Sequence, residues 1–340
     1  MIQIHQSSCT RTLSKFSECS KCVESCPKEA IELQNGIPKI SQTKCIECGA
    51  CIGVCPTDAI ELDKFSSIET IFSFLESGEN RLDCQKNIPC LASFSSQNLV
   101  SLSLLSKKDI ELDFSHCQNC EIFSGVQKQI VDSFEETNFL LEAFYTPHRL
   151  KAVSGESQKV SQISSEKRAL LKGSVFSSRF DEVSNEDSQK IRNREIPKSR
   201  KLFLFATREL EKENPNILSS EDLSFLSQKT VSDSCTNCQI CYRICPTHAL
   251  QSDYKNSFID FSANLCLKCG LCHDVCEVDS IQIRKTFSIS DFLNSKTEKI
   301  AEFDVGKCRE CGNFFTKKDG NELCYRCEIE EREAHELWGF

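Results

Sequence analysis

The sequence predicts an α+β protein made of several small modules, and three observations support this. Two segments, at 9–62 and 235–283, carry closely spaced cysteines followed by apolar, strand-like residues. Residues 66–146 alternate between helix-like and strand-like patterns, which is typical of a small parallel α/β layer. Two further Cys-x2-Cys pairs lie near the C-terminus. The predicted boundaries along the 340 residues are 1–64, 65–146, 147–200, 201–300 and 301–340.

The most specific segment holds two cysteine runs with the spacing Cys-x2-Cys-x2-Cys-x3-Cys, and Pro246 follows the first run. In this spacing three close cysteines hold one [4Fe–4S] cluster and the fourth reaches across to the other cluster. A single Zn²⁺ takes only four ligands, so these cysteines exceed what one zinc ion needs. We therefore predict two clusters that exchange their fourth ligands. The ligand sets are Cys235, Cys238, Cys241 and Cys276 for one cluster, and Cys266, Cys269, Cys272 and Cys245 for the other.

The N-terminal segment repeats this pattern with one departure. Its second run is complete, but in the first run Phe16 stands three residues before Cys19, where a cysteine is expected. The nearest spare thiol is Cys9, and closing an inserted loop of that length costs little free energy. The alternative is a three-iron or missing cluster with Cys9 unused. The predicted ligand sets are Cys9, Cys19, Cys22 and Cys55, then Cys45, Cys48, Cys51 and Cys26.

Similar sequence follows the fourth cysteine of three runs, from Pro27, Pro56 and Pro246 onward, and predicts a turn that enters a strand. Asn35-Gly36 after the first of these is a hairpin signal. The pattern resembles the two-cluster bacterial ferredoxins over residues 9–62 and 235–283, with Glu277 in place of the family's proline after the last cysteine. The resemblance implies two dicluster ferredoxin-like modules that hold four [4Fe–4S] clusters in total.

Four more cysteines lie in the α/β layer. We expect helices at 68–75, at 91–105 and up to about residue 136, and strands near Leu82, at 109–114 and at Phe139–Phe144. Parallel sheets place their sites beyond the strand ends, so these cysteines are expected to lie together there. They are predicted to hold a fifth iron–sulfur cluster or a zinc ion, or to be chemically inert. Thioredoxin-like chemistry at Cys117 and Cys120 is a weaker alternative, because it leaves the other two cysteines unexplained. The four cysteines are Cys84, Cys90, Cys117 and Cys120.

The last two segments differ sharply from each other. Residues 147–200 are rich in Ser, Lys and Arg without a ligand pattern, which indicates a polar linker. In 301–340, the two Cys-x2-Cys pairs predict a zinc-ribbon-like site of four thiolates, with iron as the rival metal, followed by an acidic helical tail. The predicted ligands are Cys308, Cys311, Cys324 and Cys327.

Composition excludes several classes of function. The chain has 24 cysteines and a formal net charge of −9, which argues against a nucleic-acid partner. Without an export signal or an apolar run long enough to span a membrane, we expect a cytoplasmic protein whose cysteines bind metal. Cys269-Gly-Leu-Cys272-His273 matches the c-type haem pattern, but these cysteines already belong to a cluster run. No GxGxxG loop indicates nucleotide chemistry.

As a whole, the layout resembles the large cytoplasmic polyferredoxins associated with formate dehydrogenases and hydrogenases. The resemblance implies an electron carrier that lacks a substrate site of its own. Its expected partner is a low-potential oxidoreductase such as formate dehydrogenase or hydrogenase. The alternatives are an assembly, maturation or scaffold protein for such an enzyme, and a redox sensor that uses Cys117 and Cys120.

Overall fold

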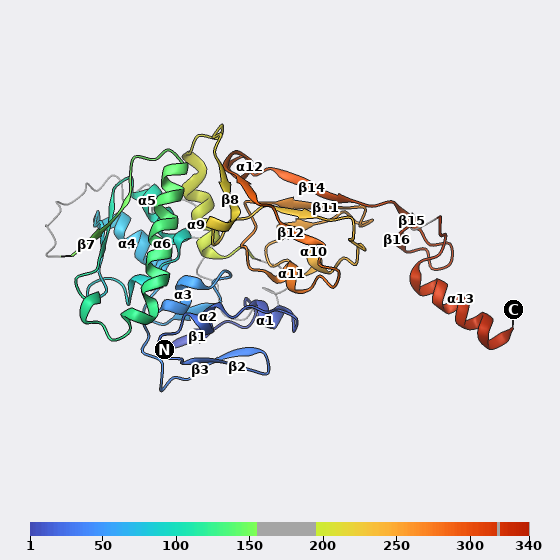
Figure 1. Cartoon of the computed structure of the whole chain (residues 1–340), viewed down its shortest axis with the longest axis horizontal. Coiled ribbons are helices and arrows are strands. Elements are labelled where there is room, and N and C mark those ends of the chain that lie inside the picture. The colour runs from blue at the N-terminus through green and yellow to red at the C-terminus, as the bar shows by residue number, and fades with distance from the viewer. Residues whose placement is uncertain (155–194, 318–319, 340) are drawn as a thin grey trace.

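The computed structural model describes residues 1–154, 195–317 and 320–339. Helices and strands are mixed along these residues, in agreement with the predicted α+β class. In Figure 1 the first module lies at the bottom, the helices and sheet that follow it lie at the left, and the C-terminal tail projects to the right. None of the helices described is long and apolar enough to cross a membrane.

The first module contains two antiparallel strand pairs. Its elements are β1 (Ile2–Ile4), α1 (Thr10–Leu13), α2 (Lys21–Glu24), β2 (Ile31–Gln34), β3 (Ile37–Ile40), α3 (Ala50–Val54) and β4 (Ile60–Leu62). β1 pairs with β4, and β2 forms a hairpin with β3. The hairpin turns at Asn35 and Gly36, whose φ angles of 53° and 79° are those a type I′ turn requires. The predicted hairpin is therefore confirmed.

The second module repeats this arrangement and extends it. Its elements are β8 (Ile217–Ser219), β9 (Lys229–Val231), α10 (Ile240–Ile244), β10 (Leu250–Gln251), β11 (Phe258–Ser262), α11 (Leu271–Asp274), β12 (Ile281–Ile283), β13 (Thr286–Ser288), α12 (Ile289–Leu293) and β14 (Thr297–Glu302). β9 pairs with β12 as β1 pairs with β4, and β10 pairs with β11 as β2 pairs with β3. β14 adds a third strand beside β11, and β8 pairs with β13.

Between the modules, the chain forms a three-stranded parallel sheet with helices. Its elements are α4 (Ser67–Ser77), β5 (Arg81–Leu82), the 3₁₀ turn η1 (Leu91–Ser93), α5 (Ser96–Ser106), β6 (Ile110–Asp113), the 3₁₀ turn η2 (Cys117–Asn119), α6 (Phe123–Ala143) and β7 (Leu150–Val153). The strand order is β5-β6-β7. The expected helix at 68–75 and strands near Leu82 and at 109–114 are present. The helix expected at 91–105 is split, because the Ser95 hydroxyl caps α5 by accepting from Asn98 N at 3.2 Å.

The prediction of a strand at Phe139–Phe144 is wrong. α6 continues to Ala143, and the third strand is β7, which falls in the stretch predicted as linker. Leu140, Leu141 and Phe144 are buried in a core shared with the second module. No proline interrupts the helix before Pro147, so this apolar run is a buried helix end. The greater part of the predicted linker, residues 155–194, lies outside the described residues.

α9 (Lys198–Ala206) connects the parts of the body. Leu202 packs in the core of the parallel sheet, while its neighbour Phe203 packs in the core of the second module. α9 also lies against α5 and α4, and the 3₁₀ turn η3 (Thr207–Glu209) follows it. One short helix therefore contributes to two hydrophobic cores.

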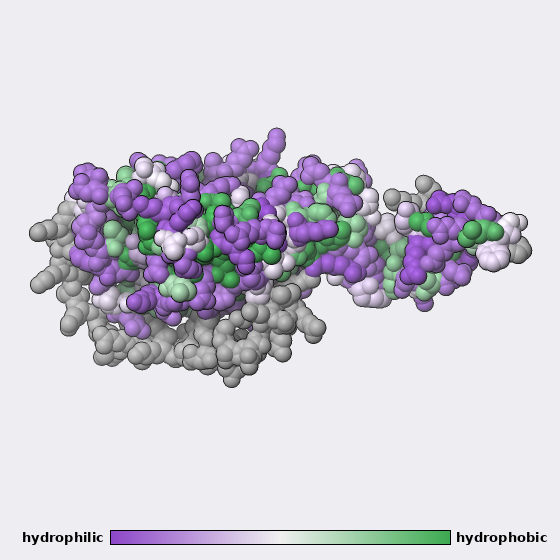
Figure 2. Space-filling model, turned by 90° about the horizontal axis from the view of Figure 1, so that it is seen from below, coloured by the Kyte–Doolittle hydropathy of each residue, from purple (hydrophilic) through white to green (hydrophobic). Residues whose placement is uncertain are grey.

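The C-terminal tail consists of β15 (Val305–Lys307), β16 (Phe314–Thr316) and α13 (Tyr325–Trp338). The β15–β16 hairpin touches the second module, because Asn237 Nδ2 donates to Thr316 Oγ1 at 2.9 Å and the Tyr254 ring meets Phe314 edge-on. Figure 2 shows the tail standing apart from the body, with hydrophilic residues over much of its visible face. The predicted acidic helix is present as α13.

Candidate metal centres

The cysteine loops of the two modules share an unusual backbone. In three runs the residue before the second cysteine and the residue after it both have positive φ. Left-handed residues turn the chain sharply, which lets cysteines that are close in sequence line one small space before a short helix begins. The pairs are Glu47 and Gly49, Asn237 and Gln239, and Lys268 and Gly270.

Two of the predicted ligand sets each line a small cavity. In the first module the fourth cysteine comes from the turn before β2, and in the second module it comes from the turn before β12. Each fourth cysteine belongs to the other run, as the predicted ligand exchange requires. The sets are Cys26, Cys45, Cys48 and Cys51, and Cys235, Cys238, Cys241 and Cys276.

The thiols of the other two sets also lie near one another. Burial, followed by the thiolates of its own set, raises the pKa of Cys22 to about 12. Burial likewise raises the pKa of Cys269, and the thiolates of its set act in the same direction. The structure thus brings each predicted set together, while ligation of clusters stays a prediction. The neighbours are Cys55, Cys19 and Cys9 for Cys22, and Cys266, Cys272 and Cys245 for Cys269.

The first module departs from the shared loop at Phe16. Ser20 occupies the position equivalent to Gly49 but has φ of −125°, and Phe16 is 58 % exposed. Cys9 lies at the start of α1, and the guanidinium of Arg11 donates to the carbonyl oxygen of Cys19. A short inserted helix therefore brings Cys9 to the set in which a cysteine is missing.

Backbone N–H groups donate to the fourth cysteine in three of the four runs. In each case the residue before the donor has positive φ. Asp279 is one of these residues, so the turn after Cys276 is kept although Glu277 replaces the proline of the other runs. N–H bonds to sulfur stabilise the thiolate and tune the potential of a bound cluster, so these turns fit a [4Fe–4S] cluster. The bonds are Ala30 N to Cys26 Sγ at 3.2 Å, Ala59 N to Cys55 Sγ at 3.3 Å, and Ser280 N to Cys276 Sγ at 3.3 Å.

Comparison with known families agrees with this geometry. Residues 17–59 match a family described as a 4Fe-4S dicluster domain, and residues 234–281 match a second family with the same description. The two modules are 4Fe-4S dicluster ferredoxin domains. The first match begins after Cys9, so the inserted helix lies outside it. A search of curated proteins found no significant match to the chain.

The second dicluster domain places a buried cation beside one of its cysteine sets. Lys229 is 3 % exposed, and its Nζ lies 2.7 Å from Nε2 of His273. Burial and then the charge of Lys229 lower the pKa of His273 to about 4, so the neutral ring accepts from the ammonium group. Burial opposes the charge on Lys229, but nearby thiolates, led by Cys266, outweigh it and raise the pKa of the lysine. Lys229 also hydrogen-bonds to Cys272.

The two dicluster domains touch each other directly. The backbone N–H of Glu18, next to Cys19, donates to Oδ2 of Asp274 at 2.9 Å. Asp274 ends α11, which follows Cys269 and contains Cys272. The contact therefore joins the loop of one cysteine set in the first domain to the helix of one set in the second.

The start of α9 forms a second link between the domains. Asp58, three residues after Cys55, accepts from the backbone N–H of Ser199 at 2.8 Å. Arg200 is fully buried and donates to the carbonyl oxygen of Phe225 at 2.8 Å. Burial lowers the pKa of Arg200 to about 10, with the charges of Cys266 and then Asp58 opposing the shift. The guanidinium thus stays charged near neutral pH, between the two domains.

The middle quartet, Cys84, Cys90, Cys117 and Cys120, lies beyond the carboxyl ends of β5 and β6. Burial, followed by Cys84 and Cys120, raises the pKa of Cys117 to about 11. A reactive thioredoxin-type thiol has a lowered pKa, so this environment argues against a redox sensor at Cys117 and Cys120.

The tail quartet has the geometry of a site for a single ion. The sulfur atoms of Cys308, Cys311, Cys324 and Cys327 all lie within 4.8 Å of one another, and Cys311 Sγ is 3.7 Å from Cys324 Sγ. Four thiolates at about 2.3 Å from one tetrahedral Zn²⁺ are about 3.8 Å apart. Desolvation opposes ionisation of Cys308, but N–H groups, first that of Cys324, lower its pKa to about 6.

The two halves of the tail site come from different elements. The first Cys-x2-Cys pair follows β15, and Gly312, with φ of 73°, completes that turn. The second pair lies at the first turn of α13, whose N-cap is Cys324. A hairpin and a helix thus meet at four thiols, which fits one metal ion.

Proposed function

We propose that the chain is a polyferredoxin that relays single electrons through four [4Fe–4S] clusters, two in each dicluster domain. Its partner in this proposal is a low-potential oxidoreductase of the cytoplasm, such as a formate dehydrogenase or hydrogenase. The observation that carries the proposal is the contact between Glu18 and Asp274, which joins a cysteine set of one domain to a set of the other. Separate carriers on one chain do not need such a contact.

Within each domain the two cysteine sets are neighbours. Within the first domain the charge of Cys22 acts on Cys51, and within the second the charge of Cys272 acts on Cys241. Together with the domain contact, these neighbours support a relay that passes through the four sets in sequence. The order is the set of Cys48, the set of Cys22, the set of Cys269 and the set of Cys238.

A bound [4Fe–4S] cluster supplies a site that takes up and releases one electron. The chain's own residues hold and insulate these sites. Most of the thiols are at least partly buried, which limits contact with water. N–H donors stabilise three of the four fourth thiolates. The cations Lys229 and Arg200 lie near Cys266. The protein needs no substrate pocket for this role.

Rapid mixing with a reduced partner tests the proposal. The full chain, prepared anaerobically, is mixed with reduced formate dehydrogenase or hydrogenase, and EPR after freeze-quenching follows the cluster signals. We expect clusters of both dicluster domains to be reduced faster than in dithionite controls. Asp274→Ala removes the acceptor for the backbone N–H of Glu18 and should slow electron transfer from one dicluster domain to the other. The exposed Asp233→Ala is the control and should leave this transfer unchanged.

Two results would contradict this function. One is that no low-potential enzyme reduces any cluster above the dithionite rate. The other is that the chain passes intact clusters to an apo-protein, which identifies it as an assembly or maturation factor.

A further inference from the structure

The middle quartet is brought together by the topology of the parallel sheet. β5 and β6 are neighbours in register, with Leu82 opposite Leu112, so the loops that follow them leave the same edge. Cys84 lies in the first loop, while Cys117 and Cys120 lie at either end of η2 in the second. Cys90 is the residue before η1.

The effects of these thiols on one another's pKa agree with this topology. Burial raises the pKa of Cys90 to about 12, and the charges of Cys84 and Cys117 contribute to the shift. Burial also raises the pKa of Cys84, and Cys120 contributes. Each of the four thiols therefore has at least one other thiol of the quartet as a neighbour.

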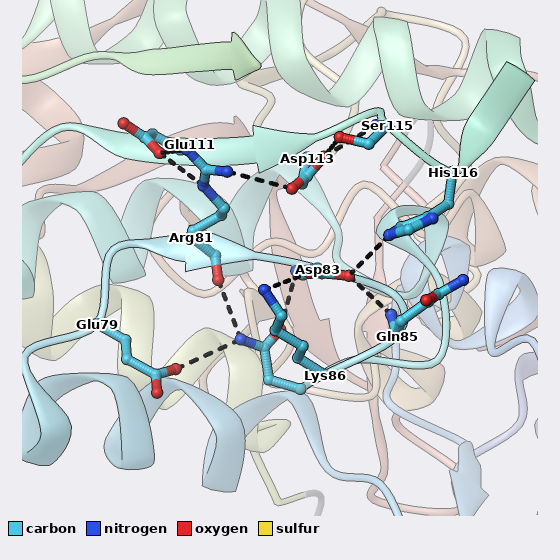
Figure 3. Close-up of polar contacts among 10 residues, drawn as sticks. Glu79, Arg81, Asp83, Gln85, Lys86, Glu111, Asp113, Ser115 and His116 are labelled. Atoms are coloured by element: carbon cyan, nitrogen blue, oxygen red, sulfur yellow. Dashed lines mark hydrogen bonds and ion pairs between the residues drawn. The ribbon is translucent and has the colours of Figure 1, made fainter. Parts of the chain in front are cut away.

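A network of polar and charged side chains connects the two loops (Figure 3). The carboxylate of Asp83 is only 3 % exposed, and its Oδ1 accepts from Gln85 N at 2.8 Å and lies 4.0 Å from His116 Nε2. Asp83 precedes Cys84, and His116 precedes Cys117. The two side chains therefore bring one cysteine loop next to the other.

The same network anchors both loops to their strands. Figure 3 shows Arg81 of β5 between Glu111 and Asp113 of β6. Arg81 Nε donates to Glu111 Oε2 at 2.8 Å, and Asp113 Oδ1 accepts from Ser115 N at 2.8 Å. These contacts hold both loops against their strands, as a prepared ligand site requires.

The spacing of the thiols favours a cluster over a single ion. Among the described residues, the four sulfur atoms of the tail quartet all lie within 4.8 Å of one another, and the thiols of the middle quartet stand farther apart. The sets of the dicluster domains share this wider spacing. Each thiolate of a [4Fe–4S] cluster binds its own iron, so its ligands stand farther apart than those of one zinc ion.

The middle quartet also lies against the first dicluster domain. The charge of Cys48 contributes to the raised pKa of Cys90, after burial. A Cβ atom on Gly49 would lie 2.9 Å from Cβ of Ser93, and one on Gly53 would overlap the carbonyl oxygen of Ala92. The loop after Cys48 and the turn after Cys90 are therefore packed without room for another methyl group.

Gln129 of α6 forms hydrogen bonds to both of these segments. Its Nε2 donates to the carbonyl oxygen of Ala50 at 3.0 Å and to that of Ala92 at 2.7 Å. Ala50 begins α3, two residues after Cys48, and Ala92 is two residues after Cys90. One side chain thus fixes the distance between the two cysteine sets.

We propose that Cys84, Cys90, Cys117 and Cys120 hold a fifth [4Fe–4S] cluster, which exchanges single electrons with the cluster of Cys26, Cys45, Cys48 and Cys51. This inference rests on the relay proposed above. In each exchange the reduced cluster loses one electron and its neighbour gains it, and no atom or proton moves. Cys120 is exposed, so the middle quartet is the end of the relay that faces a low-potential redox protein.

The first test counts metal and sulfide in the full chain, purified anaerobically. Five clusters require about 20 iron and about 20 acid-labile sulfide per chain. Cys84→Ser/Cys117→Ser should lose about four of each and keep the EPR signals of the dicluster domains. The control Cys308→Ser/Cys311→Ser should lose the tail metal and no sulfide.

A single substitution provides a second test in case Cys84→Ser/Cys117→Ser does not fold. Cys120→Ser changes only the exposed ligand and should convert one four-iron signal to a three-iron signal. In the reduced wild type, EPR should also show magnetic coupling between the fifth cluster and its neighbour, and this coupling should vanish in Cys84→Ser/Cys117→Ser.

Two outcomes overturn the site. One is about 16 sulfide per chain with no loss in the variants. The other is loss of zinc, instead of iron and sulfide, from Cys84→Ser/Cys117→Ser. The relay fails separately: a chain with about 20 sulfide whose dicluster domains no partner enzyme reduces keeps the fifth site but loses the proposed exchange.

Discussion

Lys229 occupies, in the second dicluster domain, the strand position that Ile2 occupies in the first. Ile2 lies opposite Leu62 in the β1–β4 pair, and Lys229 lies opposite Ile283 in the β9–β12 pair. Ile2 lines the cavity of the Cys48 set, and Lys229 bonds to Cys272 in the equivalent set. The two domains therefore surround equivalent cysteine sets with different charge.

Lys229→Met should lower the reduction potential of the cluster beside it. A nearby positive charge favours the reduced state, and a unit charge a few ångströms away is worth about 1–2 kcal/mol, or roughly 50–100 mV for one electron. EPR-monitored potentiometry measures the shift. The exposed Lys285→Met is the control, and an equal shift in both variants would falsify the local role of Lys229.

Cys9→Ser should convert one cluster of the first domain to a three-iron form or abolish it, because Cys9 completes the set that lacks a cysteine at Phe16. EPR and iron content report the change, with Ser8→Ala as the neighbouring control. An unaltered spectrum for Cys9→Ser means that Cys9 is unused and another ligand serves.

Gly53→Ala should destabilise the protein by about 1–3 kcal/mol, since the added methyl group overlaps the backbone of Ala92 and forces α3 away from η1. Denaturant unfolding under anaerobic conditions measures the loss, and the exposed Gln127→Ala on α6 should leave stability nearly unchanged. Equal stability of the two variants would show that this contact tolerates a side chain.

One zinc ion per chain is expected at the tail quartet. Cys308→Ser/Cys311→Ser should release it and unfold the β15–β16 hairpin locally, because metal binding contributes folding free energy at such sites. Elemental analysis and amide exchange check both effects, and the cluster spectra should stay intact. Loss of one iron with a visible absorption band would instead identify an iron site.

Electron transfer to or from the partner should slow as salt rises. The chain carries a formal charge of −9, so an oppositely charged partner surface steers association, and screening above roughly 0.1 M ionic strength weakens that steering. Stopped-flow rates across a salt series measure the effect, with a neutral mediator as the control reductant. If the rates with the partner and with the mediator depend equally on salt, electrostatic steering does not contribute to association.

The sequence alone determined the local chemistry of the dicluster domains. The spacing around Cys45 and Cys235, the turns before each strand and the Asn35-Gly36 hairpin all depend on residues close in the chain. Such features follow from backbone preferences and short ligand loops, which tertiary packing scarcely changes. The same holds for the two pairs at Cys308 and Cys324.

Only the tertiary structure decided what lies beside each cysteine set. The contact of Glu18 with Asp274, the burial of Lys229 and the packing of Cys90 near Cys48 join residues far apart in sequence. No local pattern encodes these neighbours, because they depend on how whole helices and sheets pack. The same reason explains the wrong strand at Phe139–Phe144: burial on the second domain made those apolar residues the end of a helix.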